Sequence, residues 1–354
     1  MAVQLHVAYS GTFAKGAGIV AGGPFYCAEG SIVNATGRCM THSSSIPVSS
    51  LVTTTKNWAS QGLIDPVANL ANSKVYLWSG TADNTVVPAV MNDLNTYYQA
   101  LVPSSNIVYR NNVAAGHAMI TDDYGGTCST TASPYVNDCN VDLAGALLQQ
   151  IYGPLNARNN GTLTGSFTEF DQTAYVSGHG MAATGWVYVP AACSGSTACR
   201  VHVVLHGCKQ NTATVGDVYV KRTGYNRLAD TNRLVMLYPQ TSNAATNGCW
   251  DWWGYDNANY AKKSGPQMLA IKGMVDRLAS GTGGTEPPPP PPPPSTCTSF
   301  TASNYAHTTD GRAYASLGVT YAKGSNQNMG LWNVFTTTTL KQTGTNYYVI
   351  GTCP

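Results

Sequence analysis

The stretch VHVVLHGCKQN, residues 201–211, decides the fold that we expect for this chain. Its first part, residues 201–205, is a short run dominated by β-branched and other apolar side chains. The run ends abruptly at His206-Gly207-Cys208. An apolar run of this kind, bounded by a turn, predicts a strand that is buried on both faces in the middle of a parallel sheet.

The turn after this strand is a candidate for binding chemistry. In open α/β sheets, ligands bind just beyond the carboxyl ends of the strands. Gly207 lets the backbone turn tightly and lets a substrate approach closely. A backbone N–H left free in such a turn can point at a developing oxyanion. The same pattern also fits a plain strand end with a convenient glycine, so other residues must decide between the two interpretations.

Composition narrows the class of protein. The 354 residues are enough for one large domain or two, and only 10% of them are charged, with a net charge of +2. A nucleic-acid-binding protein would show a basic stripe, so we expect no nucleic-acid partner. Ser, Thr, Asn and Gly are abundant while Lys and Glu are scarce, as is common in secreted proteins that act on polymers. No stretch is long enough to span a membrane, and we expect a monomer.

The ten cysteines favour an oxidising compartment. None lies in a CxxC motif, which argues against zinc ribbons and fingers, and we expect neither a metal nor a cofactor. Nearest-neighbour pairing would give five local disulfides, although other connectivities stay open, as does a cytosolic protein with free thiols. The neighbouring pairs are Cys27 and Cys39, Cys128 and Cys139, Cys193 and Cys199, Cys208 and Cys249, and Cys297 and Cys353.

The beginning of the chain conflicts with secretion. Met1 is followed by AVQLHVAY, which lacks both the basic start and the long apolar core of a signal peptide. Either the protein is not exported or Met1 is not its natural start.

Strand-like and helix-like patterns alternate along the first three quarters of the chain, which predicts an α/β fold with a mostly parallel sheet. Residues 27–50 are expected to form a loop. The pair 167–170 and 185–189 is expected to be antiparallel at a sheet edge. The expected strands are 16–23, 74–78, 106–109, 167–170, 185–189, 201–205 and 234–238, and the expected helices are 1–9, 53–61, 87–100, 142–152, 223–231 and 267–278.

The chain divides into a main domain over residues 1–279, a linker over 280–294 and a small module over 295–354. The linker contains eight consecutive prolines, which predict a semi-rigid polyproline II spacer of roughly 25 Å. Cys297 and Cys353 lie near the two ends of the module, where a disulfide would stabilise so small a core. The module is rich in Tyr and Thr and carries short strand-like runs.

Two further strand ends carry polar residues. Asp83 follows the strand KVYLW, and His117 follows the strand NIVY. A carboxylate and an imidazole at the carboxyl ends of neighbouring strands are two members of a nucleophile–base–acid relay, in which the imidazole is the base and the carboxylate fixes its tautomer. Taken singly, Asp83 could instead cap the following helix, and His117 could be a structural histidine.

The motifs LHGCKQN, SGTADNTV, AAGHAM and CWDWWGY resemble those of the secreted polyhydroxybutyrate (PHB) depolymerases, which are serine esterases of the α/β-hydrolase fold. Their order resembles the circularly permuted type, in which the oxyanion strand comes late. The resemblance covers residues 1–278. The segment TASNYAHTTDGRAYASLGVTYAKG, followed by YYVIGTCP, is similar to an accessory module of such hydrolases.

The resemblance implies hydrolysis of carboxylic esters through an acyl-enzyme, with poly(3-hydroxybutyrate) or its oligomers as substrate. It implies that Asp83 and His117 are triad members and that the Cys208 N–H is an oxyanion donor. It also places Trp250, Trp252 and Trp253 near the substrate, with Cys249 anchoring their loop to Cys208. The tryptophans could instead form a buried cluster, and the module could bind the polymer surface or be a spacer or tether.

One departure from the family is serious, because no G-x-S-x-G nucleophile motif occurs anywhere in the chain. Ser10, Ser79, Ser166 and Ser177 all lack the flanking glycines. In related sequences a stretch like MAVQLHVAYS follows soon after this motif. We therefore expect that Met1 is an internal residue of a longer protein and that the serine, its strand and the signal peptide are missing together.

Such a truncated chain is expected to be inactive, and its gapped sheet would promote aggregation. The alternatives are another secreted serine esterase, of the feruloyl or acetylxylan type, and a non-catalytic polymer-binding pseudoenzyme.

Overall fold

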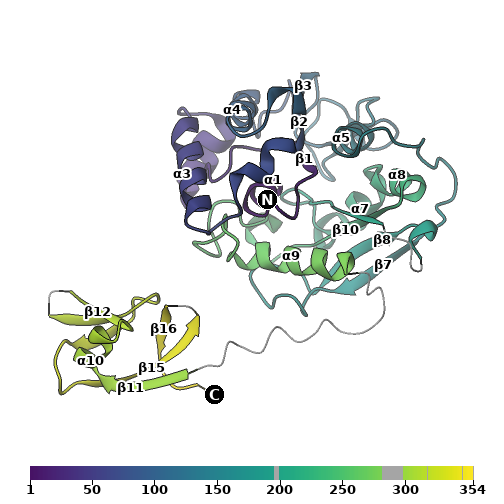
Figure 1. Ribbon diagram of the computed structural model, residues 1–354. Coiled ribbons are helices and arrows are strands. Elements are labelled where there is room, and N and C mark those ends of the chain that lie inside the picture. Colours follow the sequence, from purple (N-terminus) through teal and green to yellow (C-terminus); the bar gives the residue numbers. More distant parts are fainter. Residues whose placement is uncertain (195–198, 281–297, 317, 345, 354) are drawn as a thin grey trace. The chain divides into compact units, whose positions relative to one another are not determined.

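A computed structural model of the protein describes residues 1–194, 199–280, 298–316, 318–344 and 346–353 (Figure 1). The chain divides into two compact units, Met1–Gly284 and Thr285–Pro354. Apart from Ser280, the linker expected over 280–294 lies outside the described residues.

The first sheet of the larger unit consists of three parallel strands in the order β1-β2-β3: Gly16–Val20, Lys74–Gly80 and Ile107–Val113. The side chains of β2 alternate between two cores, as the period of a strand requires. Val75 and Leu77 belong to one hydrophobic cluster, and Tyr76 and Trp78 belong to the other. The sheet is therefore covered on both faces.

The second sheet has the order β7-β8-β10-β9. Its strands are β7 (Ser166–Asp171), β8 (Thr184–Val189), β9 (Arg200–Val203) and β10 (Leu234–Tyr238). The antiparallel pairing of β7 with β8 at one end of this sheet agrees with the sequence prediction. β8 also pairs antiparallel with β10, whereas β9 and β10 are parallel.

The position predicted for the strand at residues 201–205 is wrong. β9 lies at the end of its sheet, and its residues are exposed or only partly buried. The physical reason is that β10 alone pairs with β9 among the described strands, so one side of β9 has no neighbour. The apolar pattern alone correctly predicts the strand but not how many strands flank it, and a gap in the sheet was expected only from the missing G-x-S-x-G motif.

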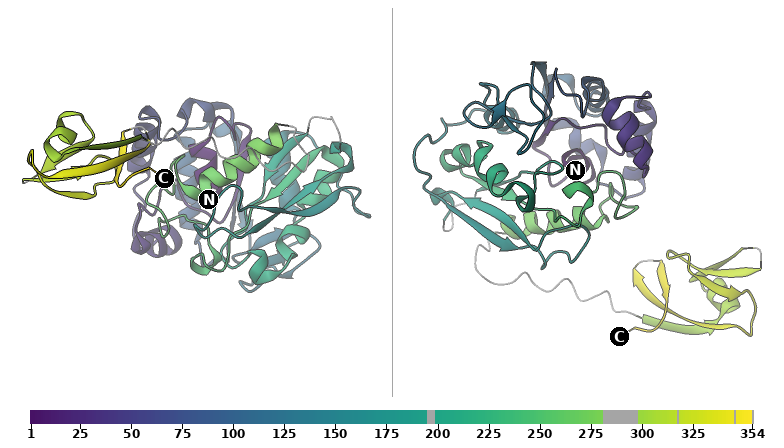
Figure 2. Two further views of the ribbon diagram at one scale, coloured as in Figure 1. Left: turned by 90° about the horizontal axis from the view of Figure 1, so that it is seen from below. Right: turned by 180° about the vertical axis from the view of Figure 1, so that it is seen from behind.

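Helices surround both sheets (Figure 2). Asp142 accepts a hydrogen bond from the Gly145 N–H and so caps α5, which is the N-cap role typical of Asp. Pro88 and Pro266 begin α4 and α9, where a proline costs no hydrogen bond. The helices of this unit are α1 (Ala2–Ala8), α2 (Ile32–Thr36), α3 (Val48–Ser60), α4 (Pro88–Gln99), α5 (Leu143–Tyr152), α6 (Thr212–Val215), α7 (Val218–Arg222), α8 (Tyr225–Asn232) and α9 (Pro266–Ala279).

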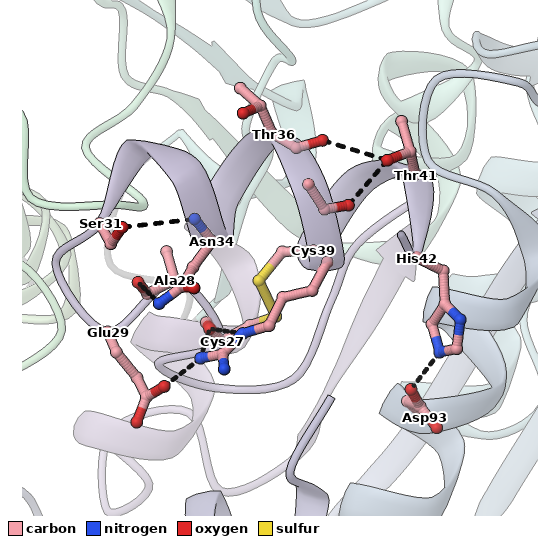
Figure 3. Close-up of a disulfide and its surroundings, with 12 residues drawn as sticks. Cys27, Ala28, Glu29, Ser31, Asn34, Thr36, Cys39, Thr41, His42 and Asp93 are labelled. Carbon is pink, nitrogen blue, oxygen red and sulfur yellow. Dashed lines mark hydrogen bonds and ion pairs between the residues drawn. A yellow bond between two sulfur atoms is a disulfide. The ribbon is translucent and has the colours of Figure 1, made fainter. Parts of the chain in front are cut away.

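Residues 27–50 are not the plain loop that the sequence suggested. They contain α2, a π-helical turn over Gly37–Thr41 and the beginning of α3. The Ser31 side chain caps α2, and the Cys27–Cys39 disulfide closes the segment (Figure 3). Arg38 also donates to the Cys27 carbonyl at 2.7 Å. Local capping and a covalent link therefore stabilise short helices that carry little periodic signal.

Smaller elements complete this unit. A three-stranded sheet in the order β4-β6-β5 follows β3 and consists of Met119–Thr121, Val136–Asp138 and Gly126–Thr127. Short 3-10 turns cover Val67–Asn72, Ser104–Asn106, Ala191–Cys193 and Thr246–Gly248.

Four of the expected disulfides are formed among the described residues: Cys27–Cys39, Cys128–Cys139, Cys193–Cys199 and Cys208–Cys249. The fifth expected pair includes Cys297, which lies outside the described residues. No helix in the described part of the chain is long and apolar enough to cross a membrane.

The smaller unit is rich in β-strands, as expected. Its sheets have the orders β11-β15-β16 and β12-β13-β14 and are antiparallel. A small core of Ala313, Ala322, Met329, Leu340 and Tyr348 holds them together. The elements are β11 (Thr298–Ser303), α10 (Asn304–Thr309), β12 (Ala313–Ser316), β13 (Val319–Ala322), β14 (Asn328–Leu331), β15 (Thr337–Gly344) and β16 (Tyr347–Ile350).

Candidate active site

Asp83 and His117 meet at the carboxyl end of the first sheet. Asp83 follows β2, His117 follows β3, and His117 Nδ1 lies 2.8 Å from Asp83 Oδ2. The Asp83 side chain is 1% exposed, whereas that of His117 is 31% exposed. The carboxylate is thus enclosed while part of the imidazole stays accessible, which is the arrangement that the two strand ends predicted.

Backbone contacts fix the orientation of this pair. Asp83 Oδ1 accepts the N–H groups of Thr85 and Val86 at 2.8 and 2.9 Å, so only Oδ2 faces the imidazole. The residue that caps α4 is Val87, which excludes the helix-cap role considered for Asp83. Because a carboxylate only accepts hydrogen bonds, His117 Nδ1 carries the proton and Nε2 has a free lone pair. The pair can therefore remove a proton from a hydroxyl group.

The turn after β9 presents a free backbone donor. The Gly207 N–H donates to Gln210 Oε1 at 2.8 Å, and Gln210 Nε2 donates to the Tyr135 carbonyl at 2.7 Å. The Cys208 N–H makes no hydrogen bond in the described part of the chain. Gln210 was not singled out from the sequence, because its partner is 75 residues away.

His206 sets the direction of the Cys208 N–H. Its Nδ1 lies 2.7 Å from the Gly207 carbonyl oxygen, and its Nε2 accepts the Thr241 N–H at 3.2 Å, so Nδ1 is the protonated nitrogen. Burial lowers the pKa of His206 to about 4, which keeps the ring neutral. Because the peptide group is planar, holding the Gly207 carbonyl also holds the Cys208 N–H on the opposite side.

The tryptophan loop lies beside this turn. The Cys208–Cys249 disulfide joins the two segments, and Trp250 Nε1 donates to the His206 carbonyl at 2.9 Å. Trp250 and Trp253 are buried and Trp252 is partly buried, so the cluster is more enclosed than an open aromatic surface. All three line the cavity described below.

A cavity of about 1020 Å³ lies next to His117, Cys208 and Trp252. It continues between β1 and β9 to Lys15 and Arg200, at the amino ends of these strands. None of the described residues that line it is a serine. Nor does the described part of the chain contain a group of three or more His, Cys, Asp or Glu residues that could hold a metal ion.

The four serines considered from the sequence lie elsewhere. Ser10 is buried and its hydroxyl donates to the Pro66 carbonyl at 3.2 Å. Ser79 is buried in β2, and Ser166 is exposed at the beginning of β7. Ser177 is exposed in the segment before β8. The chain therefore brings the His117 imidazole and the Asp83 carboxylate together, with no serine among the described residues that line the cavity beside them.

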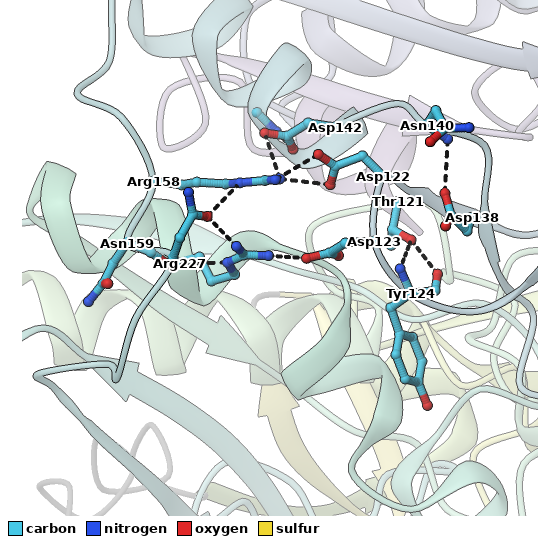
Figure 4. A network of polar contacts seen from close by, with 12 residues as sticks. Thr121, Asp122, Asp123, Tyr124, Asp138, Asn140, Asp142, Arg158, Asn159 and Arg227 are labelled. Atoms are coloured by element: carbon cyan, nitrogen blue, oxygen red, sulfur yellow. Dashed lines mark hydrogen bonds and ion pairs between the residues drawn. The ribbon is translucent and has the colours of Figure 1, made fainter.

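A polar network anchors the segment that follows β4, close in sequence to His117 (Figure 4). Arg158 donates to both carboxylate oxygens of Asp122 at 2.7 Å and lies 3.5 Å from the Asp142 carboxylate at the start of α5. Arg227 of α8 contacts Asp123. The hydrogen bond from Arg158 lowers the pKa of Asp122, so the network stays charged near neutral pH.

Comparison with known proteins gives consistent matches. A family model described as Esterase PHB depolymerase matches residues 185–278. A poly(3-hydroxybutyrate) depolymerase of Delftia acidovorans is 57% identical over 445 aligned positions, covering 100% of this chain and 90% of the relative. A polyhydroxybutyrate depolymerase of Talaromyces funiculosus is 42% identical, covering 79% of this chain and 86% of the relative.

Solved structures agree with these matches. The crystal structure of a PHB depolymerase from Penicillium funiculosum is 40% identical, with a TM-score of 0.74 over 78% of this chain and 91% of that chain. A second structure, a substituted PHB depolymerase complexed with an R3HB trimer, is 41% identical with the same TM-score and the same coverage. Both similarities extend over most of the α/β unit's length.

Proposed function

The chain belongs to the PHB depolymerase family, and from that membership we propose that its α/β unit serves to hydrolyse ester bonds of poly(3-hydroxybutyrate) or its oligomers. The observation that carries the proposal is the 2.8 Å contact between Asp83 and His117 at the edge of a large cavity. The disulfides support secretion, because such bonds persist in oxidising compartments.

The proposed chemistry proceeds through an acyl-enzyme. His117 Nε2 takes the proton of a serine hydroxyl as its oxygen attacks the ester carbonyl carbon, and Asp83 stabilises the imidazolium. The Cys208 N–H donates to the oxyanion. The bond to the alcohol oxygen then breaks, and His117 returns the proton to that oxygen. Water repeats the sequence on the acyl group and releases the acid.

The serine is the component that the 354-residue chain does not supply in a recognisable form. The sequence has no G-x-S-x-G motif, and no serine lines the described cavity. The 354-residue chain by itself is therefore proposed to bind ester substrate without turning it over.

A fused protein tests this function. A strand and G-x-S-x-G turn from a family member that carries them are placed ahead of Met1, and p-nitrophenyl butyrate hydrolysis is measured with and without the addition. Turnover by the fused protein alone, blocked by a serine-directed organophosphate, is the expected result. Activity on PHB granules but not on feruloyl or acetylxylan esters would distinguish the depolymerase from the alternative esterases.

A matched pair of variants identifies the base. His117→Gln in the fused protein should lower kcat by about 10⁶-fold. His179→Gln serves as the control, because His179 also contacts an aspartate through Nδ1, Asp256 at 2.8 Å, but does not line the cavity. Equal activity of the two variants, or turnover by the 354-residue chain itself, would contradict the assignment.

A second candidate function is polymer binding without catalysis. The smaller unit exposes Leu331, Trp332, Val334 and Phe335 within one short segment, and Phe335 is 89% exposed. An apolar segment of this kind suits adhesion to a polyester surface. Adsorption of the 354-residue chain to PHB granules, with a fused protein that releases no product, would favour this function over hydrolysis.

A further inference from the structure

A disulfide-closed loop lies beside both parts of the candidate site. It consists of residues 128–139, its two ends are joined by a disulfide, and it contains β6. Thr131 and Tyr135 of this loop line the same cavity as His117, the proposed base, and Cys208, the proposed oxyanion donor. The loop therefore lies close to two segments that follow strands of different sheets.

The loop holds the backbone of His117. The His117 N–H donates to the Thr131 hydroxyl oxygen at 2.9 Å, and the Gly116 N–H donates to the Cys128 carbonyl at 2.9 Å. A Cβ atom at Gly116 would lie 2.3 Å from the Thr130 carbonyl oxygen, so the two backbones are in direct contact. The position of His117 is therefore tied to the position of the loop.

One carbonyl oxygen of the loop joins the two parts of the site. The Tyr135 carbonyl accepts the Met119 N–H at 2.8 Å and also accepts Gln210 Nε2 at 2.7 Å. Gln210 Oε1 in turn accepts the Gly207 N–H at 2.8 Å, so this side chain uses both ends of its amide group. Three consecutive hydrogen bonds therefore lead from Met119 to Gly207.

Gln210 differs from its neighbours in the direction of its contacts. The Lys209 N–H donates to the Asn247 carbonyl at 2.9 Å, and Cys208 is bonded to Cys249, so both of these residues are tied to the segment that follows β10. The Gln210 side chain instead reaches the loop beside His117, and the residue is only 7% exposed. Breaking the contacts of a buried amide leaves unsatisfied polar atoms, which makes such a bridge costly to open.

We propose that Gln210 is a positioning residue, which fixes the turn with Cys208 relative to His117 through the Tyr135 carbonyl. The proposal rests on the proposed function for the roles of His117 and Cys208, whereas the bridge of hydrogen bonds does not depend on it. A misplacement of about 1 Å between reacting groups can lower a rate by about 10²-fold. The distance between base and oxyanion donor is therefore set by the disulfide-closed loop, through one glutamine.

A matched pair of glutamine variants tests the bridge in the 354-residue chain. Gln210→Met removes both polar ends and keeps the length of the side chain. Gln172→Met is the control, because Gln172 also accepts the Gln240 N–H at 2.8 Å and donates to the Gln240 carbonyl at 2.9 Å but does not line the cavity. Hydrogen exchange is followed by NMR, and urea denaturation separates local from global loss of protection. Gln210→Met should lower protection at Met119 and Gly207 by about tenfold, and Gln172→Met should not.

The signals that decide the proposal come from groups that the substitution does not remove. The Met119 N–H keeps its acceptor in Gln210→Met, so its exchange becomes faster only if the loop loosens. The Cys208 amide resonance should shift as well, because the turn changes its orientation. If Gln210→Met does not fold, Gln210→Glu keeps an acceptor for Gly207 but no donor when ionised, and should change Met119 alone. Altered exchange at Gly207 with Met119 and Cys208 unchanged in Gln210→Met would overturn the proposal.

The bridge should also act in the reverse direction. Replacing both cysteines of the loop with serine loosens Tyr135 and should lower protection at Gly207 by about tenfold, although neither cysteine contacts the turn. The control removes the Cys193–Cys199 disulfide, which precedes β9 and so lies at the opposite end of this strand from the turn. If the opened loop does not fold, Gly116→Ala displaces the loop at Thr130 and should have the same effect. Unchanged protection at Gly207 would overturn the proposal.

Turnover by the fused protein separates positioning from stability. Gln210→Met should lower kcat for p-nitrophenyl butyrate by about 10²-fold and leave KM within about twofold, because an oxyanion donor acts in the transition state. Gln172→Met should leave both constants unchanged. An unchanged kcat in Gln210→Met, or an equal fall in both variants, would overturn the positioning role. A fused protein without turnover counts against the proposed function, and the exchange measurements then decide the bridge.

Discussion

The strands β2 and β10 are almost entirely buried, whereas their neighbours β1 and β9 are only partly buried. The apolar run at residues 201–205 contains three β-branched residues, whereas the strand LVMLY at residues 234–238 contains one. The difference in burial therefore does not come from composition. It comes from the number of neighbours, because β2 and β10 each pair on both sides and β1 and β9 pair on one.

The larger unit therefore has two halves, one built around the sheet β1-β2-β3 and the other around the sheet β7-β8-β10-β9. Each half is well packed, but no strand pairing among the described residues joins the two sheets. The components of the candidate site are divided between the halves. Asp83 and His117 follow strands of the first sheet, and the turn with Cys208 follows a strand of the second. The cavity therefore lies between His117 and the turn with Cys208, and substitutions on its two sides can be compared.

The largest expected effect on stability comes from removing the Cys208–Cys249 disulfide, which joins the turn after β9 to the tryptophan loop. Replacing both Cys208 and Cys249 with serine removes a link across 41 residues and should lower the free energy of unfolding by about 4 kcal/mol, through the gain in unfolded-chain entropy. The control replaces Cys193 and Cys199, which are 6 residues apart, and should cost about 2 kcal/mol. Urea denaturation measures both. Equal losses of unfolding free energy would show that the number of residues between the cysteines does not determine the size of the loss.

Next, two leucine substitutions compare β2, which has a neighbouring strand on each side, with the end of the apolar run that contains β9, which has a neighbouring strand on one side. Leu77→Ala removes a fully buried side chain from β2 and should cost about 3 kcal/mol. Leu205→Ala removes a partly buried side chain that lines the cavity and should cost about 1 kcal/mol. The two losses are compared by urea denaturation. A larger loss for Leu205→Ala would mean that the Leu205 side chain is more deeply buried in solution than in the structure.

Acid should weaken both halves through buried histidines, among them His6 and His206. Burial lowers the pKa of His6 and of His206 from 6.5 to about 4, so both are neutral in the folded chain and bind protons when it unfolds. Their stabilising contribution is complete above pH 6.5 and is lost as the pH falls toward 4. Between pH 7.5 and 4.5 each should cost about 2 kcal/mol.

Variants at the two histidines check this pH dependence. His6→Gln and His206→Gln should each reduce the fall in unfolding free energy between pH 7.5 and 4.5 by about 2 kcal/mol, as measured by urea denaturation at the two pH values. His42→Gln is the control, because His42 is half-exposed and pairs with Asp93. An unchanged pH dependence in both buried-site variants would refute the assignment.

The smallest expected change in stability concerns Phe335, an exposed apolar residue of the smaller unit. Phe335 is 89% exposed in the smaller unit, and Phe335→Ser should change the unfolding free energy by less than about 0.5 kcal/mol. Sedimentation with PHB granules should nevertheless show weaker adsorption. Adsorption equal to that of the original chain would assign Phe335 no role in polymer binding.

Most of the fold was predictable from local patterns. Alternating strand and helix patterns correctly predicted the α/β class, and the two strand ends correctly brought Asp83 next to His117. The short helices within residues 27–50 were missed, because a cap at Ser31 and a disulfide stabilise them rather than periodic apolar residues.

Parts of the candidate site could not be predicted because their partners are distant in sequence. Gln210 contacts the Tyr135 carbonyl, and His206 accepts a hydrogen bond from Thr241 and has its carbonyl bound by Trp250. No local pattern announces such contacts. The sequence indicated a free N–H after Gly207, but the side chains that orient it became visible only in the folded chain.

By itself, the amino-acid sequence determined the family, the α/β class and the meeting of Asp83 with His117, because these depend on short motifs and on the order of strand ends. It also determined the absence of a G-x-S-x-G motif. Only the tertiary structure decided that the strand at residues 201–205 forms an open edge opposite β1, with a cavity of about 1020 Å³ between them. The physical reason is that the apolar side chains of a strand favour burial, whereas the elements that pack beside the strand determine whether those side chains are buried.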